Sequence, residues 1–68
     1  MIITVNGQSR ELESGATVAS VLALLEVTPD ARGVAVALDG VVVTRSRWAQ
    51  TALADGALVE IVSAIQGG

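Results

Sequence analysis

Residues 54–68 read ADGALVEIVSAIQGG, a stretch that combines a turn signal, a strand and a pair of glycines. An Asp-Gly dipeptide typical of turns precedes the apolar run 58–62, which predicts the last β-strand. Gly67 and Gly68 lack a Cβ atom, so this end of the chain can pass through a narrow channel. We therefore expect a flexible tail over about residues 63–68, with the carboxylate of Gly68 as a reactive main-chain group.

The last predicted strand should divide its side chains between the two faces of a sheet. Strand alternation puts Val59 and Ile61 on one face, and Leu58, Glu60 and Val62 on the other. Because the Glu60 carboxylate should stay in water, we assign Val59 and Ile61 to the core. Leu58 and Val62 then lie on an open face, where two aliphatic side chains beside a charge would form a docking patch for a partner.

One amphipathic helix is predicted in the first half of the chain. Its apolar residues recur at helical spacing on one face: Val18, Val21, Leu22 and Leu25. Thr17 is a residue type that caps helix N-termini. Pro29 disfavours helical backbone angles at the residue before it, so we expect the helix to end near Glu26 or Val27.

Two hairpins are predicted on either side of the helix. Asn-Gly at 6–7 and Asp-Gly at 39–40 are signals for two-residue turns in which both central residues need positive φ. The predicted strands are 1–5 with 8–12, and 34–38 with 41–43. No period is convincing between 44 and 54, where a short extra element would surround Trp48. As the chain's one aromatic residue, Trp48 is expected to be a packing anchor.

These elements predict a single domain over residues 1–68, in the order β-β-α-β-β. One helix cannot cover two separate hairpins, so the strands should merge into one sheet with the helix packed on one face. The expected fold class is therefore α+β with two layers. The sheet face opposite the helix is left open.

The composition excludes most kinds of catalytic site. The 68 residues contain no cysteine and no histidine, which excludes disulfides, thiolate metal sites and the usual proton shuttle. The seven carboxylates and four arginines have no spacing that suggests an acid/base pair or a metal site. We expect no metal and no bound cofactor, and interpret the chain as a protein acted upon by enzymes, not as an enzyme.

The charge pattern also excludes classes of partner. Four cations against seven anions give a net charge of −3, which argues against binding to nucleic acid. All four cations are arginines, so the chain has no lysine amine and any conjugation would run outward from Gly68. No signal peptide and no apolar run of about 18 residues is present, so we expect no membrane partner and a cytoplasmic location.

The chain resembles the ubiquitin-like β-grasp sulfur carriers of the ThiS/MoaD family, most nearly the thiamine-biosynthesis branch. The matching segments, in order, are residues 15–18 at the helix start, 35–38, 42–43 leading to Arg45 and Trp48, 55–56, 58–62 and Gly67-Gly68. Thr44 and Asp39 depart from the family's usual proline and asparagine, but both lie in turns. The resemblance implies a β-grasp fold, a mixed sheet in which the first and last strands are parallel.

The resemblance also implies a function. A ThiF-like adenylyltransferase would use ATP to join AMP to the carboxylate of Gly68, and a sulfur donor protein would supply the sulfur that replaces AMP. The resulting thiocarboxylate would be delivered to a ThiG-like thiazole synthase. Gly68 would be the carrier site, Gly67 would allow the tail to enter the enzyme, and Leu58 and Val62 would dock first. A terminal carboxylate resists nucleophiles until it is joined to a good leaving group, which the adenylate supplies.

Three alternatives remain open from the sequence. A MoaD-like small subunit of molybdopterin synthase would use the same chemistry at Gly68. A ubiquitin-like protein modifier would instead form an isopeptide bond between Gly68 and a lysine of a target. A plain interaction module would keep its partner after removal of both glycines.

Overall fold

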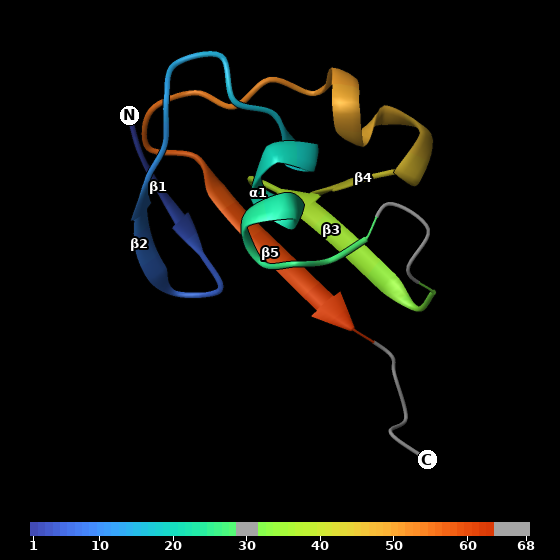
Figure 1. Ribbon diagram of the computed structural model, residues 1–68. Helices are drawn as coiled ribbons and strands as arrows, with labels where there is room; N and C mark the ends of the chain where they lie inside the picture. The colour runs from blue at the N-terminus through green and yellow to red at the C-terminus, as the bar shows by residue number, and fades with distance from the viewer. Residues whose placement is uncertain (29–31, 64–68) are drawn as a thin grey trace.

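The computed structural model describes residues 1–28 and 32–63 (Figure 1). The described elements are β1 (Ile2–Val5), β2 (Gln8–Glu11), α1 (Val18–Leu24), β3 (Val34–Leu38), β4 (Val41–Val43), the 3-10 helix η1 (Arg45–Gln50) and β5 (Leu58–Ser63). The five strands form one sheet in the order β2-β1-β5-β3-β4, and α1 crosses one of its faces. The predicted α+β class and β-grasp fold are confirmed, and η1 is the extra element expected around Trp48.

The two hairpins meet at the centre of the sheet through β5. Strands β1 and β5 are parallel, with Thr4 opposite Leu58 and Val5 opposite Val59. On its other side β5 pairs antiparallel with β3, and the pairing runs from Val34 opposite Ser63 to Leu38 opposite Val59. The parallel pairing, which the family resemblance implied, is thus present. Strand β5 continues to Ser63, one residue beyond the predicted end, because Val34 still offers it a partner.

Both hairpin turns have the backbone that their sequences predict. Asn6 and Gly7 have φ values of 50° and 83°, and Asp39 and Gly40 have values of 51° and 86°. Two successive residues with positive φ give the turn the twist of the flanking strands. The asparagine and the aspartate tolerate this left-handed conformation better than other side chains with a Cβ atom.

Helix α1 begins with a reciprocal cap and packs its apolar face on the sheet. The Thr17 hydroxyl accepts from the Ser20 backbone at 3.3 Å, and the Ser20 hydroxyl accepts from the Thr17 backbone at 3.0 Å. The side chains of Val18, Val21 and Leu22 are buried, as the helical spacing predicted. The capping box satisfies two backbone N–H groups that have no partner within the helix.

The helix ends at Leu24, earlier than the predicted Glu26 or Val27. Glu26 has a left-handed φ of 61°, which turns the chain away from the helix axis. The Val27 N–H donates to the Leu22 carbonyl at 2.8 Å, and the Glu26 N–H donates to the Ala23 carbonyl at 3.0 Å. This pair of bonds is a Schellman motif and sets the helix end, whereas Pro29, on which the prediction depended, lies outside the described residues.

The core lies between the sheet and the helical layer. Its buried residues come from every layer: Ile3, Val5, Val18, Val21, Leu22, Val36, Trp48, Leu53, Ala57 and Val59. Trp48 is 4% exposed and its indole N–H donates to the Val43 carbonyl at 2.9 Å. The Arg45 guanidinium lies 4.7 Å from the centre of the Trp48 ring. The expected packing role of Trp48 is confirmed. Within the described part of the chain, no helix is long and apolar enough to cross a membrane.

Candidate functional site

Strand β5 presents the two predicted docking residues on the sheet face opposite α1. Leu58 is 44% exposed and Val62 is 63% exposed, whereas Val59 is fully buried and Ile61 is half-buried. Glu60 is exposed between the two aliphatic residues. The predicted division of β5 between core and open face therefore agrees with the structure.

Three further apolar residues join this surface from the neighbouring strands. Across the ladder, Ala37 lies opposite Glu60, and Ala35 lies opposite Val62. Val42 lies opposite Ala37 on the next strand and is 70% exposed. We call the resulting surface the open-face patch; it comprises Ala35, Ala37, Val42, Leu58 and Val62, with Glu60 among them. Local sequence patterns do not assign the residues of β3 and β4 to this surface.

The open-face patch is hollowed over the two alanines. Ala35, Ala37, Val42, Glu60 and Val62 all line a shallow depression of about 240 Å³. The depression forms because two methyl side chains lie between larger neighbours on β4 and β5. A partner can therefore insert a side chain here in addition to covering the rim.

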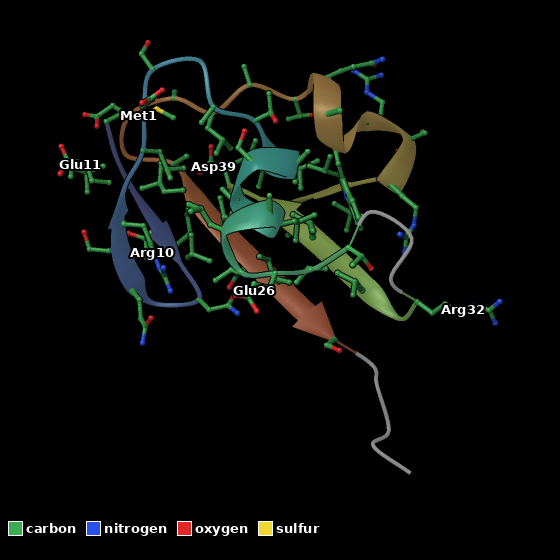
Figure 2. All side chains as sticks on the ribbon, in the orientation of Figure 1. Met1, Arg10, Glu11, Glu26, Arg32 and Asp39 are labelled. Atoms are coloured by element: carbon green, nitrogen blue, oxygen red, sulfur yellow. The ribbon has the colours of Figure 1, made fainter. Side chains whose placement is uncertain are left out.

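Turn residues hold β5 at two points along its length. At one end, the Asp39 carboxylate accepts from the Leu58 N–H at 2.9 Å, and the Asp39 N–H donates to the Leu58 carbonyl at 2.8 Å. Further along, the Asn6 side chain makes two hydrogen bonds with the backbone of Ile61. Figure 2 shows Asp39 near the start of β5. Both residues had been identified only as turn formers, yet both orient the strand that carries the patch.

Within residues 1–28 and 32–63, no group of three or more Asp, Glu, His or Cys side chains could hold a metal ion. Gly67 and Gly68, predicted as the passage and carrier residues, lie outside the described residues. The structure thus brings Leu58 and Val62 together on one face, while the predicted reactive group follows β5 in the sequence.

Comparisons with known proteins identify chains of similar sequence and fold. The model of the ThiS family matches residues 3–68. A crystal structure of the thiamine biosynthesis protein (ThiS) from Geobacter metallireducens is 33% identical, with all of both chains covered and a TM-score of 0.80. A solution NMR structure of a thiamine biosynthesis protein from the same organism is 33% identical, with a TM-score of 0.78, and the match covers all of this chain and 88% of that one.

A comparison with curated proteins gives no match. The family model nevertheless covers nearly the whole sequence, and the structural similarity extends over all of it. These matches, together with the fold and the sheet order, lead to one conclusion: the chain belongs to the ThiS family.

Proposed function

We propose that this protein is a sulfur carrier in thiamine biosynthesis and that the carboxylate of Gly68 carries the sulfur. The observation that carries the proposal is the family match, which extends through Gly67 and Gly68 to residue 68. The solved relatives are thiamine biosynthesis proteins, which favours this pathway over molybdopterin synthesis. On this proposal the chain is a substrate of enzymes, and residues 1–68 act as one carrier domain.

The first proposed step activates the terminal carboxylate. An oxygen of the Gly68 carboxylate attacks the α-phosphorus of ATP in a ThiF-like adenylyltransferase, and pyrophosphate leaves. The product is a mixed anhydride in which AMP is a good leaving group. Because the reaction consumes ATP, we assign it to the cytoplasm. The carrier needs no resident cofactor for this step.

The second proposed step exchanges AMP for sulfur. The outer sulfur of a persulfide on a donor protein attacks the activated carbonyl carbon of Gly68, and AMP leaves with the bonding electrons, so that an acyl disulfide joins the two proteins. A thiol then attacks the donor's sulfur, forms a disulfide with it and breaks the bond to the transferred sulfur, which stays on Gly68 as a thiocarboxylate and is itself a sulfur nucleophile. The thiocarboxylate would then deliver its sulfur to a ThiG-like thiazole synthase. Gly67, without a side chain, would let the tail enter each enzyme.

The fold supports a division between docking and chemistry. Val62 is exposed near the end of β5, and Gly68 is the fifth residue after Ser63. Five residues can span at most about 17 Å when fully extended. An enzyme that covers Leu58 and Val62 must therefore have its reactive centre within roughly that distance of the end of β5. Docking of the open-face patch would thus restrict the Gly68 carboxylate to the part of the enzyme that the tail can reach from the end of β5.

Intact mass spectrometry tests the proposal. The protein is weighed before and after incubation with the ThiF-like adenylyltransferase, ATP and a sulfur source, beside a variant that lacks Gly68. We expect a mass gain equal to the exchange of one oxygen for one sulfur, absent from the variant. Lysine-linked adducts instead would indicate a protein modifier. Partner binding that persists without both glycines, together with no mass gain, would indicate an inert interaction module.

A further inference from the structure

Glu60 is an exposed residue whose carboxylate is surrounded on the sheet surface by the apolar side chains of the open-face patch. It projects from the central strand between Leu58 and Val62, and Ala37 lies opposite it on β3. Its side chain forms no hydrogen bond or ion pair with any residue among 1–28 and 32–63. The carboxylate is therefore satisfied by water as long as the patch is uncovered.

Two of the described arginines lie on the helix side of the sheet. Arg10 is opposite the buried Ile3 (Figure 2), and Arg45 stacks on Trp48 in η1. Arg47 lies nearer, because it lines a separate depression beside Val42 of the patch. Neither Arg47 nor any other residue among 1–28 and 32–63 pairs with Glu60, so we expect its partner in a complex to come from another molecule.

Covering the patch would remove water from Glu60. Desolvation of an ionised carboxylate without a counter-charge carries a large penalty, which offsets much of the gain from burial of two or three aliphatic side chains. A partner surface that is only apolar would therefore bind poorly. A second copy of this chain, docked about a two-fold axis through the patch, would bring Glu60 close to its own copy, which like-charge repulsion disfavours.

We propose that Glu60 determines which partner the open-face patch accepts, by pairing with an arginine or lysine that inserts over Ala35 and Ala37. The hollow of about 240 Å³ gives space for a long side chain, whose methylene groups would pack on the two alanines and on Val42. Its cationic head would then reach Glu60, and a guanidinium could pair with both carboxylate oxygens. The inference rests on the proposed function for the identity of that partner, the ThiF-like adenylyltransferase.

Binding to this enzyme without ATP tests the inference, because docking is then measured apart from chemistry. Calorimetry at low and high salt would compare the wild type with Glu60→Gln and Glu60→Lys. We expect Glu60→Gln to weaken binding about tenfold and Glu60→Lys about a hundredfold, the range found for close interfacial charge pairs. Binding of Glu60→Gln should also depend less on salt.

Glu13 provides the matched control, because it is an exposed carboxylate in the loop between β2 and α1, beside Ala16 and Ser20. Glu13→Gln and Glu13→Lys make the same changes in net charge, and each should alter binding less than about twofold. Thermal unfolding would verify that all variants fold. Restoration of Glu60→Lys binding by one Arg→Glu or Lys→Glu change in the enzyme would identify the inserted cation.

The outcomes separate this inference from the carrier function. Equal binding of the wild type and both Glu60 variants, with a normal mass gain at Gly68, would overturn the role of Glu60 and leave the carrier function standing. Weaker binding of the Glu60 variants without any wild-type mass gain would support the docking inference and overturn the carrier chemistry. Absence of wild-type binding would overturn the docking inference, and absence of the mass gain as well would overturn both.

Discussion

The side chain of Asn6 forms two hydrogen bonds with the backbone of Ile61, although 55 positions separate these residues in the chain. Its Oδ1 accepts from the Ile61 N–H at 2.7 Å, and its Nδ2 donates to the Ile61 carbonyl at 3.1 Å. Strand β1 ends at Val5, opposite Val59. The amide group of Asn6 thus takes the place of the next peptide group and extends the ladder along β5.

Removal of this side chain should destabilise the protein in two separable ways. Asn6→Ala loses both hydrogen bonds, worth about 1 kcal/mol each, and keeps a Cβ atom at a φ of 50° without the polar side chain that makes this conformation tolerable, which costs about 1 kcal/mol more. We therefore expect the free energy of unfolding in urea to fall by about 3 kcal/mol. Asn6→Gly loses the same hydrogen bonds but also removes the Cβ atom from the left-handed region, so it should cost only about 1–2 kcal/mol. Equal losses in the two variants would contradict the backbone contribution.

Val59 and Val62 provide a matched pair on one strand. Val59 is fully buried and Val62 is 63% exposed. Val59→Ala should lower the free energy of unfolding by about 1–3 kcal/mol, because it removes buried methyl groups and leaves a cavity. Val62→Ala should change it by less than about 0.5 kcal/mol but weaken binding to the ThiF-like enzyme. Urea unfolding measures the two changes in stability, and calorimetry measures binding to the enzyme. If Val62→Ala bound the enzyme as tightly as the wild type, Val62 would not belong to the docking surface.

Local patterns in the sequence were sufficient for the turns, the helix face and the two faces of β5. Each of these depends on residues close together in the chain, such as Asn6 with Gly7 or Leu58 with Glu60. The first part of the candidate site, Leu58 and Val62, could therefore be predicted from alternation alone. The order of the strands could not, and only the parallel pairing of the first and last strands came from the family resemblance.

The rest of the site depends on register between distant segments, which local patterns do not specify. Ala37 joins Glu60 only because β3 pairs with β5 in one particular alignment. The Asn6 side chain likewise reaches the backbone of Ile61 only because β1 and β5 pair in parallel in one particular alignment. Alternation within residues 34–38 could have assigned Ala35 and Ala37 to one face, but not to the face of Glu60.

Glu26 is a site where substitution should stabilise the fold. It follows the end of α1 with a φ of 61°, a left-handed conformation that glycine usually supplies at helix ends (Figure 2). Its negative charge also lies beside the helix C-terminus, where the helix dipole disfavours it. We expect Glu26→Gly to raise the free energy of unfolding by about 0.5–1 kcal/mol. Glu26→Gln removes only the charge, so it should raise the free energy of unfolding by less than half as much as Glu26→Gly.

A substitution at Gly67 should distinguish docking of the patch from entry of the tail. On the proposed function, the tail enters the adenylyltransferase after the open-face patch has bound, so a side chain at position 67 should obstruct the second event alone. Gly67→Val should therefore lower the maximal rate of pyrophosphate release at least about tenfold, because misplacement by one ångström can cost a hundredfold. The dissociation constant measured without ATP should stay within about twofold of the wild type.

Val62→Ala should have the opposite effect and weaken docking without lowering the maximal rate, because Val62 is exposed on the open-face patch and precedes the tail. Its dissociation constant should rise, and more enzyme should be needed to reach half of the maximal rate. Comparison of the two variants in one assay is decisive, since general misfolding would raise the dissociation constant in both. An unaltered maximal rate in Gly67→Val would show that the enzyme's channel accommodates a side chain, and the reason for a glycine at this position would then have to lie outside the adenylation step.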